Sequence, residues 1–294
     1  MKQPKIGFIG QGFIGKNYAD DFERRGFSVI RYALEEPFVQ NKDRIKECDI
    51  VFVAVPTPTT PEGYDDSIVR SAVALARNGA TVVIKSTLLP GTTEAIQKSY
   101  RKKKVMDSPE FLRVTQASRD AAFPDRNMIG ITSKKHRGAA EQVLALLPAA
   151  PYNLICRARE AEYIKYAGNT FLYMKVMFAN LFYDAVETDG CDYEVVARAV
   201  AADPRIGPGH LTVKHESGHR GAKVGRGAGG MCFIKDVAAF RILYEKLLPK
   251  DKAGARILRA MECKNTELLL ASKKDLDLLS GVYGKDPKKA TCDF

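Results

Sequence analysis

The chain has 294 residues, of which 45% are hydrophobic and 28% charged, and its formal net charge is +11. These values are ordinary for a folded globular protein of about two domains, and no apolar run approaches the length that a membrane span needs. The positive charge predicts an anionic partner, and the phosphates of a nucleotide ligand satisfy it as well as a nucleic acid does. We expect neither a nucleic acid nor a membrane as partner.

The first residues lead directly into an apolar stretch at residues 5–9, without the sections typical of a secretory signal. A cytoplasmic location is therefore expected. The six cysteines are widely spaced and form no C-x-x-C pair. This spacing predicts reduced thiols, with neither a disulfide framework nor a zinc ribbon.

The first half of the chain alternates short β-branched runs with amphipathic stretches, a pattern typical of βαβ units. Helices are predicted between the strands at residues 15–25, 67–77 and 92–100. The predicted strands lie at residues 6–9, 28–32, 50–55, 81–85, 105–107 and 128–131. The fold class is therefore α/β, with a Rossmann-like doubly wound parallel sheet over residues 1–155.

The second half, residues 156–294, reads as an all-α domain after a short strand near Leu154. Residues 158–188 repeat apolar side chains at helical spacing for much longer than an average helix. The apolar length of residues 171–186 predicts that this helix packs against a second subunit in a homodimer. A glycine- and histidine-rich loop at residues 203–230 interrupts the helical pattern, and the end of the chain reads as a helix followed by a basic tail.

A glycine-rich turn, G-Q-G-F-I-G at residues 10–15, follows the first predicted strand and opens a helix. This context supports a dinucleotide-binding motif, because the glycines allow a sharp turn and a close approach of the pyrophosphate. The helix N-terminus adds N–H donors and the positive end of its dipole. The predicted cofactor contacts in this turn are Gly10, Gly12, Phe13, Ile14 and Gly15.

The second strand leaves the form of the cofactor open. Ala33 stands where an acidic residue usually binds the adenosine ribose of NAD. Arg31 could attract the 2′-phosphate of NADP, Glu35 or Glu36 could reach the ribose, or Arg31 could simply face solvent. We predict NAD, with NADP as the alternative.

Further motifs follow in a fixed order along most of the chain. They lie at residues 55–58 (VPTP), 85–87 (KST) with 90–92 (PGT), 108–113 (SPEFLR), 124–126 (PDR), 164–169 (IKYAGN), 203–207 (DPRIG) and 229–236 (GGMCFIKD). Together with the glycine turn, this series resembles the UDP-glucose/GDP-mannose (nucleotide-sugar) dehydrogenase family.

The resemblance implies that a sugar primary alcohol is oxidised to a carboxylate in two hydride transfers to NAD, through a thioester on Cys232. A helix that starts at this cysteine favours the reactive thiolate. Asp236 lies four residues further on the same helix face, where it can position a water or the alcohol proton. Lys165 and Asn169 have the same spacing on the long helix and can stabilise a developing oxyanion.

The same resemblance assigns the remaining site residues. Glu110 matches the carboxylate that assists the water attacking the thioester, and Thr87 matches a threonine that holds that water or the cofactor edge. Further cofactor contacts are implied for Val55, Pro56, Thr57 and Thr87. Substrate contacts are implied for Phe111, Leu112, Arg113, Lys165, Asn169, Gly229 and Gly230.

The sequence also departs from the family pattern. Residues 237–294 are too few for the usual C-terminal nucleotide-binding domain, so we expect a short form, with the sugar and its nucleotide unspecified. Either the substrate lacks the usual nucleotide, or another subunit completes the site, or the full reaction is lost. Ala228, Met231 and Ile234 replace the usual aromatic, serine and proline around the cysteine. Cations of the loop could bind phosphate in place of the missing domain, or the loop could be a mobile surface segment. These cations are His210, Lys214, His215, His219, Arg220, Lys223 and Arg226.

Three other functions are alternatives to this interpretation of the sequence. Residues 215–219 (HESGH) match the zinc-protease pattern H-E-x-x-H, but Gly218 and the lack of apolar periodicity argue against the helix that metal binding requires, so no metal is predicted. A two-electron hydroxyacid or alcohol dehydrogenase has a similar two-domain layout. A catalytically silent nucleotide-binding protein would not need Cys232, Lys165, Asn169, Glu110 and Asp236 together.

Overall fold

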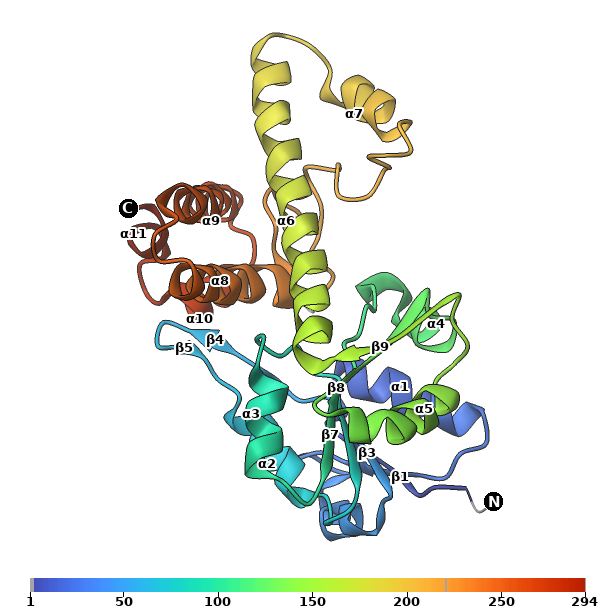
Figure 1. Ribbon diagram of the computed structural model, residues 1–294. Coiled ribbons are helices and arrows are strands. Elements are labelled where there is room, and N and C mark those ends of the chain that lie inside the picture. Colours follow the sequence, from blue (N-terminus) through green and yellow to red (C-terminus); the bar gives the residue numbers. More distant parts are fainter. Residues whose placement is uncertain (1–2, 220, 294) are drawn as a thin grey trace. The chain divides into compact units, whose positions relative to one another are not determined.

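The computed structural model describes residues 3–219 and 221–293 (Figure 1). The chain divides into two compact units. The first consists of Met1–Thr57 with Asp65–Lys165, and the second consists of Pro58–Tyr64 with Tyr166–Phe294.

The first unit is built on a seven-stranded sheet with the order β2-β1-β3-β6-β7-β8-β9. Its strands are β1 (Ile6–Ile9), β2 (Val29–Tyr32), β3 (Ile50–Val53), β6 (Thr81–Ile84), β7 (Lys104–Asp107), β8 (Arg126–Ile131) and β9 (Tyr152–Arg157). All neighbouring strands are parallel except β7 and β8, which are antiparallel. The predicted Rossmann-like sheet is thus confirmed. Its last two strands, β8 and β9, run opposite to the other five, which the sequence pattern did not reveal.

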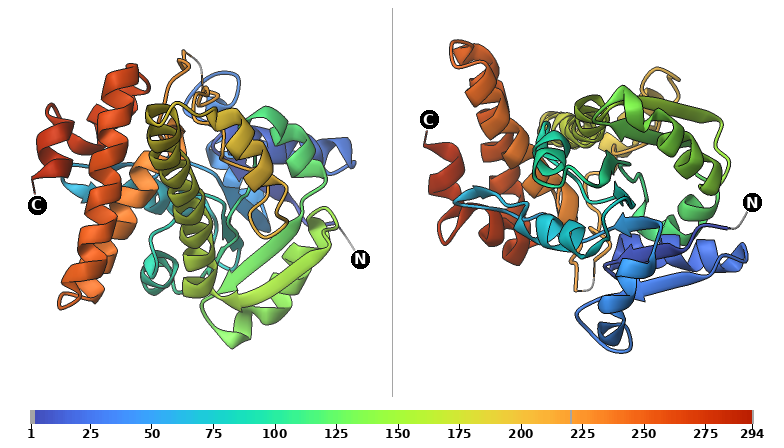
Figure 2. Two further views of the ribbon diagram at one scale, coloured as in Figure 1. Left: turned by 90° about the horizontal axis from the view of Figure 1, so that it is seen from above. Right: turned by 60° about the horizontal axis from the view of Figure 1, so that its bottom comes forward.

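Helices lie on both faces of this sheet (Figure 1, Figure 2). They are α1 (Phe13–Arg24), α2 (Ser67–Leu75), α3 (Thr92–Ser99), α4 (Ala117–Ala122) and α5 (Arg137–Leu146), with short 3₁₀ turns between elements. Val51 of β3 packs in a core with α2 and α3, whereas Phe52 packs in a second core with α1 and α5. Burial on both faces explains why these strands are apolar throughout instead of alternating.

The second unit is helical apart from a small hairpin of β4 (Thr59–Thr60) and β5 (Gly63–Tyr64), which lies against α8 and α10. Its helices are α6 (Ala158–Thr188), which begins in the first unit, α7 (Tyr193–Ala201), α8 (Gly230–Leu247), α9 (Lys252–Ser272), α10 (Leu276–Tyr283) and α11 (Pro287–Cys292). The predicted bounds of the long helix are confirmed. The predicted basic tail is wrong, because Leu279 and Val282 of α10 are buried in an apolar core with α8 and α9.

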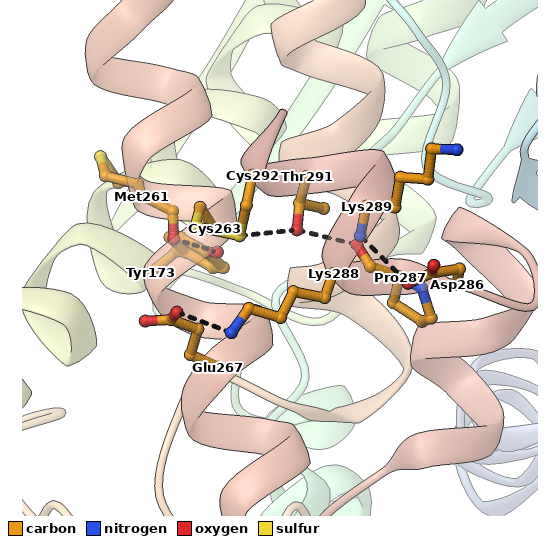
Figure 3. The surroundings of a disulfide bond; sticks show 10 residues. All are labelled: Tyr173, Met261, Cys263, Glu267, Asp286, Pro287, Lys288, Lys289, Thr291 and Cys292. Carbon is orange, nitrogen blue, oxygen red and sulfur yellow. Dashed lines mark hydrogen bonds and ion pairs between the residues drawn. A yellow bond between two sulfur atoms is a disulfide. The ribbon is translucent and has the colours of Figure 1, made fainter. Parts of the chain in front are cut away.

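A disulfide joins Cys263 of α9 to Cys292 of α11, with a Cα–Cα distance of 4.8 Å (Figure 3). The expectation of reduced thiols is therefore wrong for this pair, because the fold brings together two cysteines that no short spacing connects. Glu267, one turn along α9, is close enough to share a metal ion with them, but it pairs with Lys288 at 3.4 Å and the disulfide uses both sulfur atoms.

Among the described residues, no helix combines the length and the apolar character that crossing a bilayer requires.

Candidate active site

The glycine turn between β1 and α1 is shaped by backbone contacts. Gly10 has a φ of +90°, and a Cβ atom there would overlap the carbonyl oxygen of Ala54. A Cβ atom on Gly15 would overlap the carbonyl oxygen of Gly10. Both positions therefore need glycine for the turn itself.

Gly12 differs from its two neighbours, because a Cβ atom there would have no atom of the described chain within 4 Å. Gly12 is also the N-cap of α1, and no side chain caps this helix. The N–H groups of its first turn are therefore available to an anion such as a pyrophosphate. Phe13 is exposed at the start of the helix and Ile14 is half-buried. The turn fits a dinucleotide.

Residues 55–57, which follow β3, are hydrogen-bonded to residues 86–87, which follow β6. The Val55 N–H donates to Ser86 Oγ at 2.9 Å, and the Thr57 hydroxyl donates to the Thr87 carbonyl at 2.9 Å. Thr87 is buried, whereas Pro56 is exposed. The structure thus brings the predicted residues 55–57 and Thr87 together at the carboxyl ends of two neighbouring parallel strands, where ligands of such sheets bind.

Arg31 of β2 is occupied by the protein itself. Its guanidinium pairs with Asp20 at 2.7 Å and with Glu23 at 2.6 Å, both on α1. Two carboxylates already balance this charge, so the geometry favours neither a 2′-phosphate ligand nor the solvent-facing alternative. Glu35 and Glu36 are exposed beyond the strand.

Glu110 and Lys165 form a buried ion pair in the first unit. Lys165 Nζ lies 2.8 Å from Glu110 Oε1 and donates to the Glu110 carbonyl at 2.7 Å. The second carboxylate oxygen accepts the Leu112 N–H at 2.8 Å. A pair so thoroughly hydrogen-bonded keeps both charges in a fixed place despite the cost of burying them.

Charged residues that sequence reasoning left without a role are buried in the same unit. Burial raises the pKa of Asp107 well above its usual range, and the charge of Glu162 adds to that effect. Neither carboxylate oxygen of Asp107 has a hydrogen-bond partner among the described residues. Burial lowers the pKa of Lys85 to about 8, and its ammonium donates to Ser108 Oγ at 3.0 Å. Lys85 lies inside the motif at 85–87, and Asp107 directly precedes the motif at 108–113. These positions are the only features of the sequence that point to a role for the two residues.

The predicted substrate residues that follow Glu110 lie in different surroundings. The half-buried ring of Phe111 has the Arg126 guanidinium over it at 3.8 Å and Lys165 Nζ at 5.5 Å. Arg113 is exposed and pairs with Asp120 at 2.6 Å. Phe111 therefore lies beside the ion pair, whereas the charge of Arg113 is directed to α4.

The second unit holds the predicted nucleophile and two of its predicted partners. Helix α8 begins at Gly230, and Cys232 is exposed in its first turn. Asp236, one turn further, is buried and accepts a hydrogen bond from Asn169 Nδ2 at 2.6 Å. Lys235, to which the sequence assigned no role, pairs with the other oxygen of Asp236 at 2.6 Å. The arrangement fixes an amide and a carboxylate near the helix turn that carries the thiol.

The cations predicted to bind phosphate lie in the segment between α7 and α8. Arg226 pairs with Asp184 at 2.6 Å, so its charge is balanced within the unit. Lys214 and Lys223 are exposed. Arg220 lies outside the described residues.

The histidines of this loop contact neighbouring side chains. His215 Nε2 lies 3.1 Å from Lys274 Nζ, and His219 Nε2 lies 3.6 Å from Asp275 Oδ1. The stretch between them is not helical, so the two imidazoles do not share a helix face as a zinc-protease motif requires. Burial lowers the pKa of His215 and of His210, which favours the neutral imidazole over the cation that binds phosphate.

Two domains of one protein family match most of the chain. Residues 37–147 match the NAD binding domain of the UDP-glucose/GDP-mannose dehydrogenase family, and residues 159–267 match its central domain. The chain belongs to this family. Its first unit contains an NAD-binding domain, as the sequence predicted.

Individual members of the family show the same relationship. The UDP-glucose 6-dehydrogenase of Rhizobium meliloti is 36% identical over 216 residues, which cover 67% of this chain and 46% of that protein. The structure of a UDP-glucose dehydrogenase from Pyrobaculum islandicum is similar with a TM-score of 0.73 and 27% identity, covering 88% of this chain and 68% of that one. The chain spans about half the length of the curated relatives it matches.

A structure outside the family shares the fold. The 3-hydroxyisobutyrate dehydrogenase of Mycobacterium tuberculosis has a TM-score of 0.65 at 16% identity, covering 91% of this chain and 96% of that one. An identity this low establishes a common fold alone.

Proposed function

We propose that this protein oxidises the primary alcohol of a nucleotide sugar, with UDP-glucose as the first candidate, to a carboxylate through a thioester on Cys232. NAD, when bound at the glycine turn, accepts one hydride in each of two oxidation steps. The UDP-glucose dehydrogenases similar to this chain support the substrate class. The observation that carries the proposal is the exposed Cys232, which shares a helix with Asp236 while Asp236 is held by Asn169.

In the proposed reaction, the first oxidation converts the alcohol to an aldehyde with loss of a hydride and a proton. The Cys232 thiolate then adds to the aldehyde carbon, and the oxygen takes a proton to give a thiohemiacetal. Its oxidation, again with loss of a hydride and a proton, gives the thioester. Water then attacks the carbonyl carbon, the carbon–sulfur bond breaks, and the carboxylate leaves as the thiol is restored.

The other residues are assigned to charge and proton control. Asn169 and Lys165 supply N–H donors for the oxygen that becomes negative during addition and hydrolysis. Glu110 orients and deprotonates the attacking water, and Thr87 holds that water or the cofactor edge. Asp236 keeps the Asn169 amide in one orientation, which their 2.6 Å hydrogen bond supports.

The decisive experiment counts NADH formed per molecule of UDP-glucose consumed, by absorbance and by chromatography of the product. Two equivalents and a carboxylate product are expected. The Cys232→Ser variant should form no carboxylate, whereas Cys191→Ser, which changes another exposed cysteine, should keep full activity. Carboxylate formation by Cys232→Ser would contradict the thioester route.

A second candidate is a two-electron oxidation of a hydroxyacid, for which the fold likeness to 3-hydroxyisobutyrate dehydrogenase leaves room. This reaction produces one NADH per substrate and does not need Cys232. A panel that includes small hydroxyacids beside the nucleotide sugars separates the two reactions by stoichiometry.

We also propose that the protein forms a homodimer through α6. A row of large apolar side chains at helical spacing is exposed on this helix, and an apolar row of this kind is a common subunit contact. It comprises Phe171, Met174, Phe178, Leu181 and Phe182. Light scattering should give twice the chain mass, and a monomeric mass at micromolar concentration would contradict the proposal.

A further inference from the structure

The segment that leads into α8, residues 225–230, is held by side chains from residues 265–275. The backbone N–H of Arg226 donates a hydrogen bond to Ser272 Oγ at 2.9 Å. The Asn265 side-chain amide accepts the Ala228 N–H at 2.7 Å and donates to the Ala228 carbonyl at 2.9 Å. We call the residues that hold this segment the backbone clamp, and its members are Asn265, Ser272, Lys274 and Asp275.

The last two members of the backbone clamp are buried and bear opposite charges. Lys274 Nζ donates to the Gly227 carbonyl at 3.0 Å. Asp275 Oδ2 accepts the Gly230 N–H at 2.7 Å and a hydrogen bond from the Ser217 hydroxyl. The clamp therefore contacts this segment at almost every residue up to the start of α8.

The glycines of this segment fit the clamp. A Cβ atom on Gly229 would overlap Asp275 Oδ2, and one on Gly225 would lie 2.7 Å from Ser272 Cβ. Gly227 has a φ of +95°, and a Cβ atom there would lie 3.0 Å from Asn265 Oδ1. The absence of side chains at 225, 227 and 229 thus lets residues 265–275 approach the backbone directly.

Asp275 supplies what α8 lacks at its own N-terminus. The N-cap of α8 is Gly229, which has no side chain to accept the N–H groups of the first turn. The buried Asp275 carboxylate accepts one of them, at Gly230, and places a negative charge at the positive end of the helix dipole. Its other oxygen faces His219 Nε2 at 3.6 Å.

We propose that Asp275 is a positioning residue for Cys232. Its carboxylate caps α8 from the C-terminal part of the chain and fixes the turn that carries the thiol two residues later. Asp275 lies beyond residue 267, where the match to the family's central domain ends. The inference rests on the proposed function for the catalytic role of Cys232, while the capping contact itself does not.

The first test is hydrogen–deuterium exchange over residues 228–236, which needs no substrate. Because a helix cap is worth a fivefold to roughly tenfold change in local opening, Asp275→Ala should speed exchange there by about that factor. Ser217→Ala, which removes a single donor to Asp275, should give a smaller increase. Asp277→Asn, an exposed acid in the first turn of α10, is the matched control and should change nothing.

The second test measures the reactivity of the Cys232 thiol. Alkylation of Cys232 by iodoacetamide, measured by peptide mass spectrometry relative to Cys191 in the same molecule, should change at least threefold in Asp275→Ala and stay constant in Asp277→Asn. With an active substrate, kcat should fall about tenfold while the KM for NAD is unchanged, because the change misplaces the nucleophile without touching the cofactor turn. A general loss of structure would instead speed exchange in α6 and α9 as well.

Unchanged exchange at residues 228–236 would overturn the proposal, and so would faster exchange with unchanged alkylation and kcat. If Asp275→Ala does not fold, Asp275→Asn, which keeps the size of the side chain, is measured in the same way. If the unsubstituted protein oxidises no nucleotide sugar, the proposed function fails, and exchange with alkylation still decides the role of Asp275.

Discussion

Two glycine-rich turns in this molecule each lead into a helix, and they are stabilised in different ways. The turn at residues 10–15 is shaped by backbone packing, and the N-terminus of α1 has no side-chain cap. The segment at residues 225–230 is held by the backbone clamp, and Asp275 occupies the N-terminus of α8.

The difference separates two uses of a helix N-terminus. An uncapped helix with open space at Gly12 can give its N–H groups to an anionic ligand. A helix whose first N–H is already taken by a carboxylate has less to offer a ligand, but its first turn is fixed in place. The first arrangement suits cofactor binding, and the second suits the precise placement of Cys232.

The disulfide gives the largest expected effect, and the loop that it closes contains residues of the backbone clamp. Cys263 and Cys292 close a loop with a sequence separation of 29 that contains Ser272, Lys274 and Asp275. Because cross-linking a loop of this length restricts the unfolded chain, Cys292→Ser should lower the free energy of unfolding by about 3–4 kcal/mol. Urea denaturation of both proteins without reductant measures this difference in the free energy of unfolding.

Two controls sharpen that measurement. Cys191→Ser removes an exposed thiol outside the disulfide and should leave stability within about 0.5 kcal/mol. Dithiothreitol should destabilise the unsubstituted protein but not Cys292→Ser. Equal free energies of unfolding for the unsubstituted protein with and without reductant would contradict the predicted stabilisation by this bond.

The contrast between the turns also marks what the sequence could predict. The turn at residues 10–15 is predictable from the sequence, because its strand, glycines and helix follow one another within a few residues. The bounds of the long helix α6 are predictable because its apolar spacing is regular from residue 158 to 188. Local patterns of this kind are directly readable.

The backbone clamp could not be predicted, because Asn265 and Ala228 are 37 residues apart and Gly230 and Asp275 are 45 apart. No spacing rule connects a lysine–aspartate pair near the end of a chain with a glycine segment before it. The same holds for the disulfide. The proposed site residues were found by their motifs, whereas the pairing of Glu110 with Lys165 and of Asn169 with Asp236 depends on tertiary structure.

A methyl group at Gly15 should break the first turn. In Gly15→Ala, the Cβ atom would overlap the Gly10 carbonyl oxygen, and opening the turn should cost about 2–3 kcal/mol, more than the helix propensity that alanine gains. Gly138→Ala is the matched control in α5, where an added Cβ meets no described atom. It should be neutral or stabilise by up to about 1 kcal/mol. Thermal and urea unfolding of both variants check the prediction.

Lys274 should make the second turn sensitive to pH. Burial lowers its pKa to about 8 from 10.5, and the charge of Asp275 opposes the shift. Between these two values the unfolded chain binds more protons than the folded one, so the free energy of unfolding contributed by this group rises with pH. Between pH 7.5 and 10, the free energy of unfolding of the unsubstituted protein should therefore rise by about 2 kcal/mol relative to that of Lys274→Met, as measured by urea denaturation at each pH. A constant difference across that range would mean that Lys274 does not titrate in this window.

A methyl group at Gly12 should affect ligand binding without affecting the fold, which is the sharpest test of the open first turn. No described atom lies within 4 Å of the added Cβ, so Gly12→Ala should keep the free energy of unfolding within about 0.5 kcal/mol. The methyl group would lie where the pyrophosphate must approach the N–H groups of α1, so the Kd for NADH should rise about tenfold or more. Fluorescence titration measures it, with Gly138→Ala as control. If NADH binding survives in Gly12→Ala, the space at Gly12 is not where the dinucleotide lies, and the difference between the two turns loses its functional meaning.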